Sequence, residues 1–277
     1  MALSAEELKK LKVKAKEIRE KIVKVTEVCG GSHIGGALSQ TDVLVALYYK
    51  FLKIDPKNPT WAERDRFVLS KGHGGVGHAV ILGDKGYFDE KELLKFNKTG
   101  SPFGMHLDCL KVKGVDASTG SLGHGFAIAL GMAMGARFQK FNWHTYCLVG
   151  DGECHEGTIW ETAMAASHYK VMNMTTVVDR NQFCIDGCTE DIMQLEPFKA
   201  KWEAFGWKVA DIDGHDFNQI CDAIDQSLAQ KEKPFVIIAN TIKGKGVDFM
   251  EGDKKWHYAG IDSELAKKAI ESIRRGS

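Results

Sequence analysis

The sequence lacks several features that would assign it to a special class of protein. Its 277 residues carry 37 basic and 37 acidic side chains, so the formal net charge is zero. Nucleic-acid-binding surfaces need an excess of positive charge that is missing here. No apolar run approaches the roughly 20 residues of a membrane-spanning helix, and the charged amphipathic start does not resemble a signal peptide. We therefore expect a cytoplasmic protein without a nucleic-acid or membrane partner.

Signals for cysteine pairing are also missing. The seven cysteines are scattered along the chain and odd in number. The closest pair, Cys184 and Cys188, has no second pair that would complete a zinc site. We interpret the cysteines as reduced thiols, which are typical of intracellular proteins.

The chain does contain a regular alternation of strand-like and helix-like segments. Apolar runs predict four strands, at residues 66–70, 144–149, 174–179 and 234–240. Helices are predicted at 126–138, 156–170, 197–205 and 216–230. This alternation indicates an α/β fold, a doubly wound and mostly parallel sheet with helices on both faces. The strands are apolar throughout rather than alternating, as expected for strands buried on both sides.

Further helices are predicted at the two ends of the chain. Ser4 and Glu7 form a capping box, which opens a helix that runs to about Val28. Helices are also expected after Thr41, at 85–97 and at 262–273, whereas the glycine-rich stretches 71–78 and 101–125 are expected to be loops. No linker or repeat divides the chain, so we expect a single domain over residues 1–277.

Polar residues and glycines follow every predicted strand. They are Lys71, Gly72 and His73 after the first strand, Gly150, Asp151 and Gly152 after the second, Arg180 and Asn181 after the third, and Thr241 and Lys243 after the fourth. Ligands of open α/β sheets bind beyond the carboxyl ends of the strands. The pattern therefore predicts a binding site at this edge of the sheet.

The stretch VGDGECHEG, residues 149–157, is the densest of these strand ends. Asp151 and Asn181 follow consecutive strands, and their carboxylate and amide oxygens suit Mg²⁺ or Ca²⁺. Gly150 and Gly152 would let the backbone approach phosphates closely, with the next helix aiming N–H groups at them. A plain turn capped by Asp151 is the alternative. A zinc hydrolase using Asp151, Cys154 and His155 is disfavoured, because these residues lack the helical spacing that lets side chains converge on one metal.

The GDG triplet, followed after 28 residues by Asn181, resembles the signature of thiamine-diphosphate enzymes. The wider resemblance is to the diphosphate-binding domain of transketolases and covers essentially the whole chain. It rests on six stretches in the family's order, namely SHIGGALS (32–39), FVLSKGHGG (67–75), GMHLDCLKVKGVDASTGSLGHG (104–125), VGDGECHEG (149–157), DRNQFCIDG (179–187) and ANTIKGKG (239–246).

The resemblance implies roles for individual residues. The implied ligands of Mg²⁺, with Ca²⁺ or Mn²⁺ as substitutes, are Asp151, the side chain of Asn181 and the backbone carbonyl of Phe183. The implied contacts of thiamine diphosphate are His73, Gly120, Leu122, Gly150, Gly152, Glu153, Asn181 and Lys243. The implied catalytic residues are His33, His73, His106 and His257, which would line the substrate channel, and Glu156, which would lie where two active sites communicate across a subunit interface. We expect His144, His168 and His215 to be ordinary structural or surface histidines.

The resemblance also implies a partner. In transketolases the acid that activates the cofactor comes from a second, pyrimidine-binding domain, for which no segment is found in this sequence. We therefore expect an N-terminal subunit that joins a separate chain carrying that domain and its activating glutamate. The expected assembly is a heterotetramer that transfers a two-carbon ketol unit from a ketose to an aldose, with sugars or sugar phosphates as substrates.

Three positions depart from the family pattern. Ile34 and Leu107 follow the first two channel histidines, where prolines are usual, and His124 replaces a usual glutamine. These changes lie near the expected substrate and favour, as an alternative, a specialised carboligase subunit of secondary or unusual-sugar metabolism. Two other interpretations are the α subunit of a 2-oxo-acid dehydrogenase, which the channel histidines disfavour, and a non-catalytic scaffold that keeps the fold, which the intact pair Asp151 and Asn181 disfavours.

Overall fold

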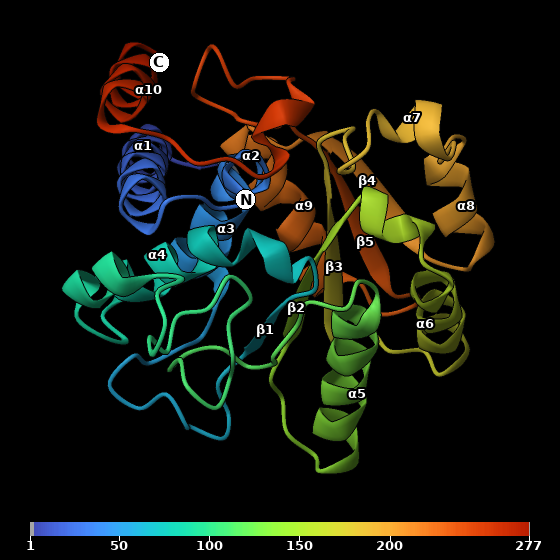
Figure 1. The fold of residues 1–277 in the computed structure, drawn as a ribbon. Coiled ribbons are helices and arrows are strands. Elements are labelled where there is room, and N and C mark those ends of the chain that lie inside the picture. The colour runs from blue at the N-terminus through green and yellow to red at the C-terminus, as the bar shows by residue number, and fades with distance from the viewer. Residues whose placement is uncertain (1–2, 277) are drawn as a thin grey trace.

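The structure is a computed structural model that describes residues 3–276. Its centre is one sheet of five parallel strands in the order β1-β2-β3-β5-β4 (Figure 1). The strands are β1 (Arg66–Leu69), β2 (Thr145–Gly150), β3 (Met174–Arg180), β4 (Lys208–Asp213) and β5 (Phe235–Asn240). Gly150 at the end of β2 lies beside Asp179 of β3, so the loops that follow these two strands start next to each other.

The apolar strands are shared between two hydrophobic cores, one on each face of the sheet. In β2, Tyr146 and Leu148 join one core and Cys147 and Val149 the other. Successive side chains of a strand point to opposite faces, so a strand covered on both sides must be apolar throughout. The α/β prediction, with a parallel sheet between two helical layers, is thus confirmed.

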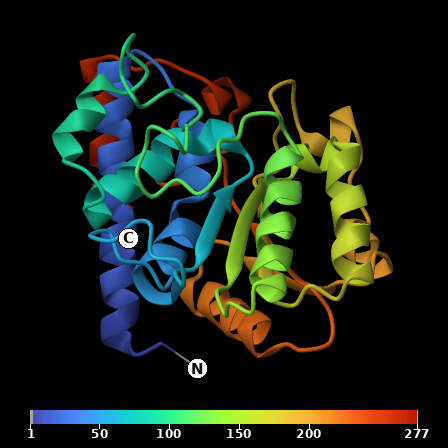
Figure 2. The ribbon, with the colours of Figure 1, turned by 90° about the horizontal axis from the view of Figure 1, so that it is seen from below.

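Different helices cover the two faces (Figures 1 and 2). One face is covered by α1 (Ala5–Cys29), α2 (Ile34–Ser39), α3 (Thr41–Ala46), α4 (Gly75–Lys85) and α9 (Phe217–Ala229), with α10 (Ser263–Arg275) packed on α1. The other face is covered by α5 (His124–Phe138), α6 (Gly157–His168) and α8 (Phe198–Ala204), while α7 (Thr189–Ile192) is a short turn beyond β3. No helix within residues 3–276 is long and apolar enough to cross a bilayer.

The helix ends follow local rules that the sequence already shows. The Ser4 hydroxyl accepts from the Glu7 N–H, and the Glu7 carboxylate accepts from the Ser4 N–H, which completes the predicted capping box. Asp262 caps α10 through the Leu265 N–H. Segment 101–123 contains no helix or strand, as predicted.

Some predicted elements were wrong. The helix expected at 85–97 is only a 3-10 turn, Glu90–Lys95. The helix of this region is instead α4, which begins at Gly75 inside a stretch that we expected to be a loop. Helix α4 was not predicted because it contains several glycines, which have a low helix propensity. One of these glycines allows close packing, since a Cβ at Gly77 would lie 3.4 Å from the Ala37 Cβ. Strand β4 was missed because it is a half-exposed edge strand that contains the charged residues Lys208, Asp211 and Asp213.

Candidate active site

A cavity of about 280 Å³ lies beyond the carboxyl ends of β1, β2 and β3. Nearly all residues that the sequence singled out line it, namely His33, His73, His106, Gly120, Leu122, Gly150, Asp151, Gly152, Glu153, Asn181, Phe183, Lys243 and His257. They come from seven separate stretches of sequence. The parallel sheet brings together those that follow β1, β2, β3 and β5, because all its strands end at the same edge.

The predicted metal ligands form one group of oxygens at this cavity. Asp151 is buried; its Oδ1 accepts from the Gly152 N–H at 2.9 Å and its Oδ2 from the Gln182 N–H at 2.6 Å. The Asn181 Oδ1 accepts from the Phe183 N–H at 3.2 Å. A carboxylate, an amide oxygen and a backbone carbonyl are hard-oxygen donors, which suits a magnesium ion that keeps its other positions for water and phosphate.

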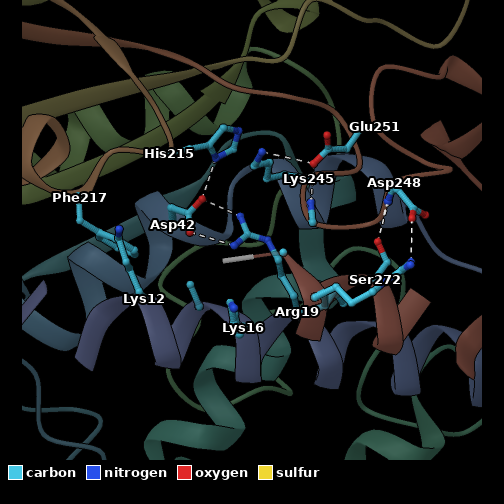
Figure 3. A pocket seen from close by; sticks show the side chains of 15 residues that line it. Lys12, Lys16, Arg19, Asp42, His215, Phe217, Lys245, Asp248, Glu251 and Ser272 are labelled. Carbon is cyan, nitrogen blue, oxygen red and sulfur yellow. Dashed lines mark hydrogen bonds and ion pairs between the residues drawn. The ribbon is translucent and has the colours of Figure 1, made fainter. Parts of the chain in front are cut away.

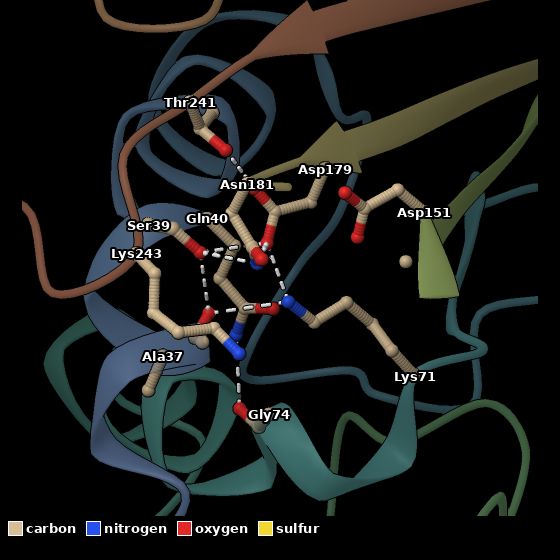
Figure 4. Close-up of polar contacts among 12 residues, drawn as sticks. Ala37, Ser39, Gln40, Lys71, Gly74, Asp151, Asp179, Asn181, Thr241 and Lys243 are labelled. Atoms are coloured by element: carbon tan, nitrogen blue, oxygen red, sulfur yellow. Dashed lines mark hydrogen bonds and ion pairs between the residues drawn. The ribbon is translucent and has the colours of Figure 1, made fainter. Parts of the chain in front are cut away.

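A second, deeper network lies behind these ligands (Figure 4). Asp179 is fully buried and accepts hydrogen bonds from Lys71 Nζ at 2.5 Å, Ser39 Oγ at 2.7 Å, Thr241 Oγ1 at 2.5 Å and Asn181 Nδ2 at 3.1 Å. Burial alone would raise the pKa of Asp179, but the Lys71 charge and these donors hold it below its usual value. Asp179 is therefore an ionised carboxylate with every oxygen engaged.

The electrostatics of the cavity fit a cation next to an anion. Burial, followed by the nearby Asp179 charge, raises the pKa of Asp151 to about 6, so this carboxylate needs a compensating positive charge. Burial and the Lys71 charge lower the pKa of Lys243 to about 8, and the Lys243 ammonium group donates to the Phe183 carbonyl at 3.1 Å, beside the predicted metal ligands. A divalent cation at Asp151 and an anionic diphosphate near Lys243 would each relieve one of these costs.

Four histidines form the wall of the cavity. The ring of His33 lies 5.1 Å from His73, 6.3 Å from His106 and 5.4 Å from His257, measured between centroids. Lys243 Nζ lies 3.0 Å from His257 Nδ1; an ammonium can only donate, so this nitrogen accepts and the proton is on Nε2. The sequence could not show that these four histidines, which are up to 224 residues apart, share one wall.

The four histidines have lowered pKa values, which favours their neutral form. Burial, followed by neighbouring positive groups, lowers the pKa of His33 to about 4 and that of His257 to about 3, and places the pKa of His73 well below its usual value. Burial also lowers the pKa of His106. A neutral imidazole has one donor and one acceptor nitrogen. In His257 the acceptor is already bound to Lys243, so this ring can offer only its donor to a hydroxyl group.

The two glutamates of the VGDGECHEG stretch lie in different environments. Glu153 is buried and accepts from Ser70 Oγ at 2.5 Å and the Gly123 N–H at 2.8 Å on Oε1, and from the Gly150 N–H at 3.0 Å on Oε2. It thereby joins three loops of the cavity. Glu156 is exposed at the start of α6 and does not line the cavity, so the structure does not bring it to the other predicted catalytic residues.

The three departures from the family pattern do not line the cavity with their side chains. Ile34 and Leu107 are buried in a hydrophobic core, and the His124 side chain is exposed at the start of α5. Any effect of Ile34 and Leu107 on substrate choice must therefore pass through the backbone of the neighbouring residues His33 and His106.

The residues that suggested zinc have other partners. The Cys154 thiol is buried and donates to the Gly150 carbonyl, while His155 Nε2 lies 2.8 Å from the Met193 carbonyl. Within residues 3–276, no three His, Cys, Asp or Glu side chains come close enough together to hold a metal. All seven cysteines are free thiols in the structure.

A larger cavity, of about 640 Å³, lies between α1, α10 and the loop 245–251, and His215 and Phe217, which follow β4, also line it (Figure 3). Its floor is a buried ion pair in which Arg19 donates to both oxygens of Asp42, at 3.0 and 2.6 Å. His215 Nδ1 donates to Asp42 at 2.7 Å, and its Nε2 accepts from the Ile242 N–H at 2.9 Å. This histidine is structural, as expected, and anchors the segment that leads to Lys243.

Sequence reasoning missed several residues of the active-site cavity. Gly36, Lys71, Cys184 and Ile185 also line it, and Asp179 lies behind it. Lys71 was recognised as a strand-end residue but received no role. A carboxylate inside an apolar strand was the available signal for Asp179, because such a group is rarely buried without partners.

Comparisons with known proteins agree with this geometry. The family model for the thiamine diphosphate binding domain of transketolase matches residues 11–275. A 6-deoxy-6-sulfo-D-fructose transketolase subunit of Clostridium sp. is 42% identical over 96% of each chain. An apulose-4-phosphate transketolase subunit of Phocaeicola vulgatus is 37% identical over 95% of this chain and 93% of its own.

Longer proteins are similar over part of their length. The transketolase of Campylobacter jejuni superimposes with a TM-score of 0.90 at 34% identity, over 95% of this chain and 42% of that one. Human transketolase is 33% identical, and this chain again spans 42% of it. The chain thus corresponds to one part of these longer proteins and to nearly the full length of the two subunits.

Proposed function

This chain belongs to the transketolase family, and we propose that it is the diphosphate-binding subunit of a two-chain, Mg²⁺-dependent enzyme that transfers a two-carbon ketol unit from a ketose to an aldose. One observation carries the proposal. The oxygens of Asp151, Asn181 and Phe183, the ammonium group of Lys243 and the histidine wall all face a single cavity. The combination suits a metal-bound diphosphate on one side and a polyhydroxylated substrate on the other.

The cofactor, when bound, supplies the electron sink for the ketol carbanion, and the protein supplies binding, orientation and proton transfer. Asp151, Asn181 and the Phe183 carbonyl would hold the metal ion, with Gly152 and Lys243 next to the diphosphate. The neutral histidines would bind the hydroxyl and carbonyl oxygens of the sugar. Their arrangement in a wall orients the substrate before any bond changes, which is a large part of enzymatic rate acceleration.

An exposed apolar face supports assembly with a partner chain. Helix α5 is apolar almost all round, although only one side of it packs on the sheet. On its other side Ile128 is 40% exposed, and on the neighbouring α6 Met164 is 58% exposed. A helix that is apolar on both sides is normally covered on both sides. We propose that an interface within a heterotetramer covers this face, with the exposed Glu156 at its edge.

The names of two relatives indicate a class of substrate. The two named relatives act on 6-deoxy-6-sulfo-D-fructose and apulose-4-phosphate according to their names, and both names specify one subunit of an enzyme. Each of these sugars carries an anionic group at one end. We propose an anionic ketose of this kind as donor, with a specialised sugar rather than a common pentose phosphate as the favoured candidate because of these two relatives.

The test is a reconstitution. The purified chain, the partner chain and the mixture are each assayed with thiamine diphosphate, Mg²⁺, a panel of ketose donors and an aldose acceptor. We expect turnover only in the mixture. Turnover by this chain alone would refute the two-chain site. His106→Ala in the mixture should raise the KM for the sugar more than the Kd for the cofactor, and the opposite result would assign His106 to the cofactor.

A further inference from the structure

We propose that Asp179 is a positioning residue that holds the Asn181 amide with its oxygen toward the metal site. The inference rests on the proposed function, because it assumes that Asn181 binds the metal ion. It gives a role to Asp179, which opens the stretch DRNQFCIDG but received no role from the sequence. Hydrogen bonds between four buried side chains, those of Ser39, Lys71, Asp179 and Asn181, support it (Figure 4).

An asparagine amide can be placed in two orientations, and only its partners decide between them. Asn181 Nδ2 lies 3.1 Å from Asp179 Oδ2 and 3.3 Å from Ser39 Oγ. On the other side, Asn181 Oδ1 accepts from the Phe183 N–H at 3.2 Å. Turning the amide over would place its oxygen against an ionised carboxylate and its NH₂ group against a backbone N–H. Both contacts would be repulsive, so the oxygen stays on the side of the cavity.

Asp179 is suited to positioning rather than to binding the metal itself. Its Oδ2 accepts from Lys71, Ser39 and Asn181, and its Oδ1 accepts from Thr241. No lone pair of Oδ2 is left for an ion at the cavity. The donors belong to the ends of α2, β1, β3 and β5, so the carboxylate also fixes these ends relative to one another.

The charge of Asp179 is essential to this orientation. A neutral amide at this position could turn either way and would no longer dictate how its neighbour lies. Lys71 is the buried counter-ion, and it also donates to the Gly36 carbonyl at 3.2 Å. Replacing a residue that is hydrogen-bonded to a metal ligand typically lowers the metal affinity by about 10–100-fold.

The test measures metal binding directly. Mg²⁺ is titrated calorimetrically into the full chain saturated with thiamine diphosphate. Asp179→Asn should weaken Mg²⁺ binding by about 10–100-fold. The matched control is Asp213→Asn, the same change at an exposed carboxylate that ends β4, which should leave the affinity within about twofold of the original. Circular dichroism verifies that each variant is folded.

An exchange of the two side chains provides the decisive variant. In the double substitution Asp179→Asn and Asn181→Asp, position 181 supplies a carboxylate oxygen to the metal and position 179 donates to it. The net charge next to Lys71 is unchanged. We expect the double variant to bind Mg²⁺ at least about tenfold more tightly than Asp179→Asn alone, because the donor and acceptor match again. A purely structural role of Asp179 would not produce this rescue.

Each outcome decides the question. A folded Asp179→Asn protein with unchanged Mg²⁺ affinity, or a folded double variant that is no better, would overturn the proposal. If Asp179→Asn does not fold, the variant Ser39→Ala is measured instead. It removes one acceptor of the Asn181 amide and leaves Lys71 paired with Asp179. A loss of Mg²⁺ affinity in this variant supports the proposal, and an unchanged Mg²⁺ affinity refutes it. Failure of the unsubstituted chain to bind Mg²⁺ with thiamine diphosphate, both alone and together with its partner chain, would refute the proposed function itself and is recognised before any variant is made.

Discussion

Glu153 provides the sharpest stability prediction, because three loops of the cavity converge on one buried carboxylate. Two donors, Ser70 Oγ and the Gly123 N–H, share its Oε1, and the Gly150 N–H donates to its Oε2. In Glu153→Gln the amide oxygen can keep the first two bonds. The new NH₂ group then faces the Gly150 N–H, so two donors are left opposed in a buried place.

The magnitude follows from these contacts. An unsatisfied buried polar group costs about 1–3 kcal/mol. Burial raises the pKa of Glu153, so its charge is itself unfavourable in the fold, and the neutral amide recovers part of the loss. We expect Glu153→Gln to lower the free energy of unfolding by about 1–3 kcal/mol and Glu153→Ala, which removes the acceptor for all three donors, by about 3–5 kcal/mol.

The assay is urea unfolding followed by circular dichroism, with Glu156→Gln as the control. Glu156 lies three residues away and is exposed, so its substitution should change the free energy of unfolding by no more than about 0.5 kcal/mol. The reasoning would be refuted if Glu153→Gln were as harmless as the control. It would also be refuted if Glu153→Ala were no worse than Glu153→Gln.

Three further predictions concern the proposed metal ligand, the proposed subunit interface and the buried ion pair. Asp151→Asn should weaken Mg²⁺-dependent cofactor binding by more than about 100-fold, because replacing residues that are only hydrogen-bonded to a metal ligand already lowers metal affinity by about 10–100-fold. If calorimetry found tight cofactor binding in this variant, Asp151 would not be a metal ligand. Ile128→Asp should dissociate the assembly in light scattering and leave the circular dichroism spectrum intact, whereas Val13→Asp, an equally exposed change on α1, should leave the mass unchanged. Asp42→Asn should destabilise the chain by about 3–5 kcal/mol at pH 7, because it leaves the buried Arg19 charge without its partner. Burial would raise the pKa of Asp42, but Arg19 and His215 hold it below its usual 3.8. The stabilisation by Asp42 is therefore present above about pH 3.8 and is lost as the pH falls below it. If the difference in the free energy of unfolding between the original protein and Asp42→Asn stayed constant down to about pH 2, the assignment would be contradicted.

Much of the fold could be predicted because its signals are local. The apolar runs of β1, β2, β3 and β5 and the capping residues of α1 and α10 act over a few neighbouring positions. Helix α4 and strand β4 were missed for the opposite reason. The glycines of α4 allow close packing against distant segments, such as Ala37 beside Gly77. The polar residues of β4 are exposed because the sheet order places this strand at an edge.

The candidate site divides in the same way. Asp151, Asn181 and the glycine-flanked histidines could be named from short motifs, because a metal-bound diphosphate requires particular residue types directly after strands. Lys71 and Asp179 could not, since their importance lies in a contact between residues 108 positions apart. Glu153 was named as a cofactor contact, yet its oxygens are occupied by three protein donors.

The sequence by itself thus determined the parallel α/β fold, the family and the residue types that face the cavity, because each depends on periodicity or on short spacings. Only the tertiary structure decided how these residues behave. It made the histidines neutral by burying them together, raised the pKa of Asp151 by burying it and placing Asp179 nearby, and left one side of α5 without a cover. Burial and charge depend on what the folded chain brings close in space, and distance along the sequence does not contain that information.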